Sequence, residues 1–194
     1  MRNLIVLVIL IFCFNSCTSI IKNAHGTNKY VQFNDLGDYR NYISTKYKVD
    51  INKVYYIAKD SYNRFCNLVV AKKVDYFYGA YTNDTTEVQK SDYLKENESC
   101  LGRVIKEINS SPEEQQFNKK IKNFTFKEFS FLSIVNNTPF EFLNNGKKKI
   151  FLIYSYKTGT LRMNDFIQIE NLIKSTSNRE LVIITIDDVF DLPK

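Results

Sequence analysis

Two apolar segments separated by one amphipathic segment, between Lys149 and Asp188, most constrain the fold of this chain. Residues 149–156 read KIFLIYSY, residues 180–188 read ELVIITIDD, and the residues between them keep a helical spacing to about Ser177. Apolar runs without polar alternation are typical of strands buried on both faces of a parallel sheet. The pattern therefore predicts a strand, a crossover helix and a second parallel strand, which together form a core unit of an α/β fold.

In such a unit, ligands and catalytic groups gather at the carboxyl ends of the strands. The expected location of a site is therefore Tyr154 to Leu161, directly after the first strand. These residues carry no thiol, imidazole or carboxylate, so the sequence indicates no reaction there. Asp187 and Asp188 end the second strand, and we interpret them as solvated residues at a strand terminus, with an active-site role as the alternative.

The N-terminus carries a charged residue, Arg2, followed by eleven apolar residues from Leu4 to Phe14. This run predicts a secretory signal, because it is too short to cross roughly 30 Å of hydrocarbon comfortably as a helix. The next residues, Asn15-Ser16-Cys17, complete a sequence that resembles the lipobox of bacterial lipoproteins. The resemblance implies a signal peptide over 1–16 and lipidation of Cys17, which becomes the new N-terminus. An ordinary signal peptide cut nearby, or an uncleaved anchor, is the alternative.

The lipobox resemblance implies a bacterial cell-envelope protein, anchored to a membrane and facing away from the cytoplasm. Several acyl chains would make that anchoring stable, since one chain alone binds only marginally. Residues 17–33 are polar and irregular and predict a tether, and residues 34–194 predict one α/β domain with halves at 34–115 and 116–194. The 44% hydrophobic and 25% charged residues of the chain argue against disorder across most of its length.

The charge of the chain predicts attraction to acidic membrane or envelope surfaces and no nucleic-acid partner. The chain has 27 basic and 21 acidic residues, and removing 1–16 removes only Arg2, which leaves a net charge of 26 − 21 = +5. These charges are interspersed, and Lys147-Lys148-Lys149 is the only short block. Lysines that precede an apolar strand commonly cap it in solvent, and an exported location makes nucleic acid a poor fit.

The remaining elements follow from caps, turns and side-chain periodicity. The N-terminal half predicts a helix from Asn34 or Asp35 to about Lys48, strands at 52–58, 64–73 and 75–82, a turn at 82–85, and helices at 91–108 and from Pro112. A short helix is the alternative for 64–73. The second half predicts a strand at 124–135, a turn at Asn136-Asn137, a second hairpin arm at 139–143 and a turn at Asn145-Gly146.

The segment PFEFLNNGKKKIFLIYSYKTGTLR resembles the entry into a thioredoxin-like domain of the exported, lipoprotein-associated kind. In that family a hairpin ends in a Gly-Lys turn, a buried strand follows, and an active-site loop leads into a helix. The resemblance places the redox motif on Thr158-Gly159-Thr160-Leu161, followed by the basic Arg162. Thr158 and Leu161 occupy both cysteine positions, so this loop holds no thiolate for disulfide exchange. We therefore expect it to serve as structure or as a binding edge.

The end of the chain limits this resemblance, because only seven residues follow Asp187. The later hairpin and helix of a thioredoxin fold cannot fit there, so residues 36–115 must supply the missing strands or the sheet is incomplete. The fold prediction is thus α/β, with a C-terminal β-α-β unit and an incomplete or rearranged thioredoxin-like sheet. A different αβ sandwich is the alternative.

The chain has four cysteines and one histidine, which limits the thiol and metal chemistry that it can perform. Cys13 leaves with the signal and Cys17 is assigned to lipid, so Cys66 and Cys100 remain as a pair in a compartment that permits disulfides. They form either a structural disulfide or two separate buried thiols, and they lack the CxxC spacing of a catalytic pair. His25 lies in the tether, and no His or Cys cluster exists, so we expect no metal centre and no cofactor.

These patterns favour a non-catalytic, lipid-anchored envelope protein that binds a partner or stabilises an assembly. The expected partners are the membrane, through the N-terminal lipid, and an envelope protein. The competing hypothesis is an exported thiol–disulfide oxidoreductase that uses Cys66 or Cys100. Four aromatic residues supply either a contact surface or sheet packing, namely Tyr76, Phe77, Tyr78 and Tyr81.

Overall fold

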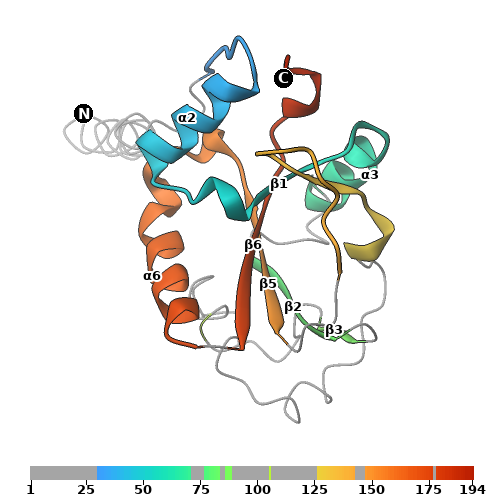
Figure 1. Ribbon diagram of the computed structural model, residues 1–194, viewed down its shortest axis with the longest axis vertical. Helices are drawn as coiled ribbons and strands as arrows, with labels where there is room; N and C mark the ends of the chain where they lie inside the picture. The colour runs from blue at the N-terminus through green and yellow to red at the C-terminus, as the bar shows by residue number, and fades with distance from the viewer. Residues whose placement is uncertain are drawn as a thin grey trace, which may run out of the picture.

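A six-stranded mixed sheet organises the part of the chain that the computed structural model describes, namely residues 30–70, 77–83, 86–88, 105, 126–142, 147–176 and 178–194. The strands are β1 (Val54–Ile57), β2 (Phe77–Asn83), β3 (Thr86–Val88), β4 (Phe131–Ser133), β5 (Lys148–Tyr154) and β6 (Arg179–Thr185). They lie in the order β3-β2-β5-β6-β1-β4. Helices α2 (Leu36–Tyr47) and α6 (Met163–Lys174) lie on one side of the sheet, and α3 (Lys59–Val70) lies on the other (Figure 1). The predicted α/β class is confirmed.

The predicted β-α-β unit is the centre of this sheet. β5 and β6 pair in parallel over seven positions, from Lys148 opposite Arg179 to Tyr154 opposite Thr185, and α6 connects them. β1 adds a third parallel strand against β6, while β2 pairs with β5 in the antiparallel sense. The continuous apolar runs thus correspond to the two innermost strands, as the absence of polar alternation predicted.

Successive residues of these strands point to opposite faces and build two hydrophobic clusters. On β5, Leu152 packs in the cluster beneath α2 and α6, whereas Phe151 packs in the cluster beneath α3. The second cluster is rich in phenylalanine, and the rings of Phe126 and Phe151 stack with centroids 4.3 Å apart. Burying each large apolar side chain stabilises the fold by about 1.5 to 3 kcal/mol.

Helix α2 confirms the predicted first helix, because its cap and its buried face match the sequence pattern. The side chain of Asp35 accepts a hydrogen bond from the backbone N–H of Asp38 at 2.8 Å. The helix ends at Tyr47, and its C-cap residue, Lys48, has a φ of 55° in the left-handed region. Four buried side chains at helical spacing face the sheet, namely Leu36, Tyr39, Ile43 and Tyr47.

The strand predicted at 64–73 is wrong and the alternative, a short helix, is confirmed for residues 64–70, because Lys59–Val70 forms helix α3. Residues 71–73 lie outside the described residues. Ser61 and Phe65 are buried four positions apart on the side that faces the sheet, which is a helical spacing. Of the three valines that favoured a strand, Val69 and Val70 lie at the end of this helix, where Val70 is 81% exposed, and Val74 lies outside the described residues. Packing of Phe65 against the sheet therefore outweighs the β propensity of two terminal residues.

The strands predicted at 52–58 and 75–82 are confirmed as β1 and β2, within a few residues at each end. β2 pairs with β3, a strand that the sequence pattern did not indicate. The predicted turn at 82–85 falls between them, and Asp84 and Thr85 lie outside the described residues. The helices predicted at 91–108 and from Pro112 also lie outside the described residues, except for Ile105, which is helical.

The strand predicted at 124–135 is much shorter than expected. A 3₁₀ turn, η2 (Phe126–Glu128), precedes β4, which pairs with β1. The predicted hairpin is confirmed in reduced form, since Leu132 and Pro139 form an antiparallel bridge. Asn137 makes the turn with a φ of 59°, a conformation that asparagine tolerates better than most residues. The predicted turn at Asn145-Gly146 lies outside the described residues.

Candidate functional site at the carboxyl edge of the sheet

The carboxyl ends of β5 and β6 bring two polar side chains together. Ser155 directly follows β5, and Asp187 lies two residues beyond β6. The backbone N–H of Ile186 donates to the carbonyl of Tyr154 at 2.9 Å, so the two chain segments stay adjacent past the last strand residue. The neighbouring helix α2 places Tyr39 over the same point.

The carboxylate of Asp187 accepts hydrogen bonds from four different residues. Oδ1 accepts from the Ser155 hydroxyl at 2.5 Å. Oδ2 accepts from the Tyr39 hydroxyl at 2.7 Å, from the backbone N–H of Tyr156 at 3.0 Å and from the Thr185 hydroxyl at 3.1 Å. Asp187 is only 3% exposed, so these neutral donors replace its hydration shell. We call these five residues the Asp187 cluster.

Burial raises the pKa of Asp187, although the hydrogen bonds from Ser155, Tyr156, Tyr39 and Thr185 act in the opposite direction. No lysine or arginine of the described segments forms an ion pair with this carboxylate. Burial, followed by the nearby charge of Asp187, also raises the pKa of Tyr39 well above its ordinary value. Tyr39 therefore remains a phenol and acts as a hydrogen-bond donor.

The solvated interpretation of the two strand-end aspartates is correct for Asp188, which is exposed, and wrong for Asp187. The physical reason is the position of Tyr39, which lies 148 positions earlier in the sequence and covers the carboxylate. Sequence reasoning also missed Ser155 as a partner. The one available signal was its position at the end of a buried strand, and in the structure it lies one residue past the last paired position, Tyr154.

The Asp187 cluster holds loops in place and leaves little room for a substrate. Ser155 is 6% exposed, and its hydroxyl oxygen accepts a hydrogen bond from the backbone N–H of Lys157 at 3.2 Å while donating to Asp187. A serine nucleophile must present its oxygen to a reacting atom, and this oxygen is turned inward. The arrangement therefore stabilises the turn after β5 and joins it to α2 and β6.

The loop predicted from the redox-motif position lies within η3 (Tyr156–Arg162), beside the Asp187 cluster. The Thr158 hydroxyl donates to the carbonyl of Ser155 at 2.7 Å, so it closes the turn that precedes α6. Gly159 is buried and has φ 61° and ψ −147°, a conformation that essentially only glycine adopts. Thr160 is exposed, and Leu161 continues the same 3₁₀ segment.

Aromatic rings surround the turn after β5. Tyr156 packs edge-on against Phe33 with centroids 5.3 Å apart, and its hydroxyl donates to the carbonyl of Val31 at 3.4 Å. The ring centroid of Tyr42 lies 6.1 Å from that of Tyr156. Lys157 remains exposed, with its Nζ 5.9 Å from the Tyr156 ring centroid. Lys157 and Thr160 therefore give this edge an outward, polar surface.

Cys66 lies on α3, which contacts the same edge of the sheet from the other face. The Tyr62 hydroxyl of α3 donates to the carbonyl of Ile186 at 2.8 Å. The Cys66 thiol is free and half-buried, and burial, followed by the charges of Asp188 and Asp187, raises its pKa against the lowering effect of Tyr62. A raised pKa disfavours the thiolate that nucleophilic attack requires.

Two other predicted site residues, Cys17 and Cys100, lie outside the described residues. Lipidation and a Cys66–Cys100 disulfide therefore remain predictions. The described ranges contain no group of three metal-ligating side chains, and none of their helices is long and apolar enough to cross a membrane.

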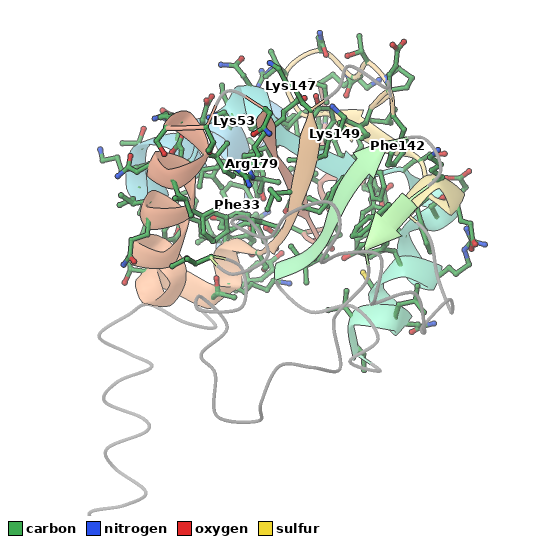
Figure 2. The ribbon with its side chains drawn as sticks, turned by 90° about the horizontal axis from the view of Figure 1, so that it is seen from below. Phe33, Lys53, Phe142, Lys147, Lys149 and Arg179 are labelled. Carbon is green, nitrogen blue, oxygen red and sulfur yellow. The ribbon has the colours of Figure 1, made fainter. Side chains whose placement is uncertain are left out.

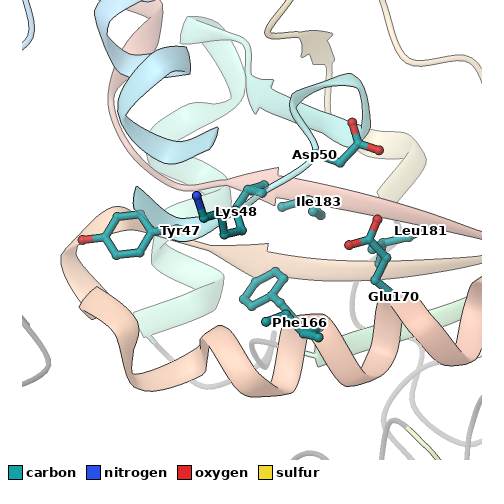
Figure 3. Close-up of a pocket in the computed structure, with 9 residues that line it drawn as sticks. Tyr47, Lys48, Asp50, Phe166, Glu170, Leu181 and Ile183 are labelled. Carbon is teal, nitrogen blue, oxygen red and sulfur yellow. The ribbon is translucent and has the colours of Figure 1, made fainter. Parts of the chain in front are cut away.

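A groove lies on the α2 and α6 side of the sheet, between the end of α2 and the middle of α6 (Figure 3). Its lining includes Tyr47, Phe166 and Leu181. The free volume inside is about 10 Å³, which is room for about one water molecule. A salt bridge beside it joins Lys53 to Glu170 at 2.7 Å. The groove is therefore too small for an organic ligand.

Comparison with known proteins gives no relative of this chain: no family model, no curated protein and no solved structure matches it.

Proposed function

We propose that this chain is a lipid-anchored protein of the bacterial cell envelope whose α/β domain is a non-catalytic binding or assembly module. In this proposal Cys17 carries the lipid, and residues 17–33 tether the domain to the membrane. The partner-binding surface is the exposed part of the loop after β5, around Lys157 and Thr160. The partner is another envelope protein.

The observation that carries this proposal is the closed state of the Asp187 cluster. In α/β folds the carboxyl edge of the sheet is where catalytic side chains gather. Here the carboxylate of Asp187 accepts four hydrogen bonds from the protein itself, and the Ser155 hydroxyl turns inward. The polar groups with catalytic potential at this edge are thus used to hold the loop, which supports a rigid binding edge rather than a reaction centre.

The order of the strands supports the thioredoxin-like interpretation in a rearranged form. In that interpretation residues 36–115 supply further strands of the sheet. β2 and β3, at residues 77–83 and 86–88, form an antiparallel hairpin against β5. In this proposal the hairpin therefore precedes the β-α-β unit in sequence and completes the same sheet.

The raised pKa of Cys66 also supports the non-catalytic proposal. An oxidoreductase would need a low-pKa, accessible thiolate. The alternative function, thiol–disulfide exchange through Cys66 and Cys100, is favoured by one observation, namely the position of Cys66 on the helix that contacts the carboxyl edge through Tyr62. An insulin-reduction assay separates the two: we expect no turnover above background, and turnover that Cys66→Ser abolishes would establish the alternative.

Lipid anchoring is tested by growing cells with a fatty-acid analogue. We expect the wild-type chain to carry the label and Cys17→Ala to lose it, because no other residue in a lipobox accepts the lipid. A wild-type chain that carries no label and stays in the membrane fraction as fully as Cys17→Ala would contradict the anchoring part of the proposal.

The binding surface is tested with a photo-crosslinking amino acid in place of Lys157, compared with the same substitution at the exposed Glu141. We expect an adduct of one size from Lys157 and none from Glu141, and excess purified chain should compete it away. Adducts of equal yield at both positions would contradict a specific surface at the loop.

A further inference from the structure

The chain enters the domain at the carboxyl edge of the sheet, beside the turn after β5. The hydroxyl of Tyr156 donates to the carbonyl of Val31 at 3.4 Å, and the ring of Phe33 packs edge-on against that of Tyr156 with centroids 5.3 Å apart. The backbone N–H of Leu36 donates to the carbonyl of Pro193 at 2.8 Å. These contacts fix the first described residues to one edge of the domain.

Phe33 anchors this entry point. Its ring also packs edge-on against two rings of α2, with centroids 5.1 Å from Tyr39 and 5.3 Å from Tyr42. Phe33 belongs to the hydrophobic cluster on the α2 and α6 side of the sheet, and Figure 2 labels it on the side of α6, across the sheet from Phe142. Edge-to-face aromatic pairs stabilise a contact beyond the area that they bury. The entry point is therefore held at the carboxyl edge.

Exposed side chains surround the entry point. Tyr30 is 80% exposed, and Lys157 is exposed directly after Tyr156. Lys46 is also exposed, and its Nζ donates to the Tyr42 hydroxyl at 2.6 Å and lies 4.7 Å from the centroid of that ring. Because the ring centroids of Tyr42 and Tyr156 lie 6.1 Å apart, the two lysines border the same pair of rings. We call Tyr30, Lys46 and Lys157 the entry surface.

The two lysines of the entry surface form no ion pair with a carboxylate of the described segments. Lys59, at the same edge of the sheet, differs from them because it pairs with Asp191 at 2.7 Å. The carboxylate of Asp187, beneath the surface, already accepts hydrogen bonds from its own four donors. A carboxylate from another molecule therefore complements the charge of Lys46 and Lys157.

The length of the tether limits how far the entry surface lies from the membrane. In the proposed function Cys17 carries the lipid, and the twelve residues 18–29 separate it from Tyr30. A chain of that length spans at most about 40 Å. The seven residues of β5 separate the entry surface from the amino edge, where β5 and β6 begin, by about 20 Å. The entry surface is therefore the part of the domain that is tied closest to the bilayer.

We propose that the partner of this domain is a protein held in the same membrane, which presents an acidic side chain to Lys46 and Lys157 close to the bilayer surface. This inference rests on the proposed function and names the class of partner that its surface receives. A partner free in the compartment has no need of an entry surface beside the tether. For two proteins confined to one membrane, the tether sets the effective concentration of the surface at its partner, so binding depends on tether length.

The test places a photo-crosslinking analogue of phenylalanine at Tyr30 of the full chain in bacterial cells, which leaves both lysines intact. The natural chain is compared with one in which about 36 glycine and serine residues, a flexible sequence, are inserted before Lys29. Effective concentration falls roughly as the −3/2 power of length, so an about fourfold longer tether should lower the yield of the protein adduct about eightfold. A chain with residues 18–29 in shuffled order keeps the length and should keep the yield.

A pair of charge variants tests the acidic contact. Lys157→Gln should lower the yield of the adduct from position 30 by up to about fivefold, the range for one exposed ion pair. Asn178 is exposed directly before β6, at the amino edge. Asn178→Asp changes the charge by the same one unit and should leave the yield unchanged. Equal yields from Lys157→Gln and the natural chain would overturn the acidic contact.

The outcomes separate this proposal from the proposed function. An adduct whose yield is independent of tether length would assign the surface to a partner free in the compartment, which overturns this proposal and leaves the binding surface in place. An adduct with lipid alone would overturn it by assigning the entry surface to the bilayer. An adduct from position 157 with none from position 30 would overturn it by separating the binding surface from the entry point. Absence of adducts from both positions would contradict the proposed function itself.

Discussion

The Asp187 cluster predicts opposite effects for one substitution at two buried tyrosines. Tyr39 and Tyr154 are both fully or nearly fully buried on the same side of the sheet. The hydroxyl of Tyr39 donates to the carboxylate of Asp187 at 2.7 Å and lies 2.8 Å from the hydroxyl of Thr185. The hydroxyl of Tyr154 is buried without a hydrogen-bond partner. Replacing either tyrosine by phenylalanine removes only the hydroxyl group, so the difference between the two variants reports the hydrogen bonds of that hydroxyl.

We expect Tyr39→Phe to lower the free energy of unfolding by about 1.5 to 3 kcal/mol, the range for a hydrogen bond to a charged group. The lost donor leaves Asp187 buried with less compensation. Tyr154→Phe should leave the free energy of unfolding unchanged or raise it by up to about 1 kcal/mol, because it removes an unsatisfied buried hydroxyl. Tyr154→Phe, which removes a hydroxyl without a hydrogen-bond partner, is thus the control for Tyr39→Phe, which removes a hydroxyl with one.

The assay is urea unfolding of the full chain at neutral pH, followed by far-ultraviolet circular dichroism because the chain contains no tryptophan. The slopes of the transitions should agree, so that a shift in midpoint reports stability. The double variant Tyr39→Phe with Asp187→Asn should lose less than the sum of the two single losses, since Tyr39→Phe removes the donor and Asp187→Asn removes the charge of the acceptor in the same hydrogen bond. Equal destabilisation by Tyr39→Phe and Tyr154→Phe would refute the reasoning.

The pH dependence of the same cluster follows from the raised pKa of Asp187. The folded protein holds this proton more tightly than the unfolded chain, whose aspartates titrate at about 3.9. The resulting stabilisation is fully present below the unfolded pKa and is lost as the pH rises through the folded pKa. The stability of the wild type relative to Asp187→Asn should therefore increase on acidification from neutral pH, and an unchanged difference would contradict the buried environment.

Three further predictions concern other parts of the domain, each measured by the same unfolding assay. Gly159→Ala should cost about 1 to 3 kcal/mol, because its backbone conformation is open essentially only to glycine, and an unchanged midpoint would contradict the described turn. Phe65→Ala, at a side chain with no exposed surface, should cost about 3 to 5 kcal/mol, whereas the exposed Val70→Ala on the same helix should stay within about 0.5 kcal/mol. Glu180→Gln should cost about 1 to 3 kcal/mol by leaving the buried Lys149 without its carboxylate, and adding Lys149→Met should recover part of that loss; no recovery would argue against the ion pair.

The sequence pattern predicted the elements whose local and tertiary signals agree. The two central strands are apolar on both faces, and the structure buries both faces. Helix α2 has a capping aspartate, Asp35, and a buried face at helical spacing, so its position follows from nearby residues alone. Residues 64–73 were predicted as a strand because the valines of this segment favour β structure. The four-residue spacing of the buried Ser61 and Phe65, which is helical, was not used.

The candidate site was only partly predictable, because its geometry depends on contacts between distant residues. The carboxyl edge was expected from the β-α-β pattern, and the Thr158–Leu161 loop does lie there. The burial of Asp187 requires α2, which begins at Leu36, to lie over the end of β6. Nothing near Asp187 in the sequence reports that contact, so a buried hydrogen-bonded carboxylate and a solvated one look alike at the level of sequence.

The position of the β2–β3 hairpin extends this argument from side chains to topology. On one side β5 pairs with β2, whose first residue, Phe77, lies 71 positions before Lys148, the first residue of β5. On the other side β5 pairs with β6, which follows it directly after α6.

 We expect the β2–β3 hairpin to join the sheet only after β5 is in place, because its pairing with β5 closes a long loop, and that closure costs entropy that local contacts do not offset. The β5-α6-β6 unit should therefore order first and the hairpin join it later, which is why the local pattern revealed the unit and the strand β2 but not the pairing of β2 with β5. Hydrogen exchange during refolding should show protection of Leu152 and Ile183 before Ala80, and earlier protection of Ala80 would show that the hairpin, rather than the β-α-β unit, organises the sheet.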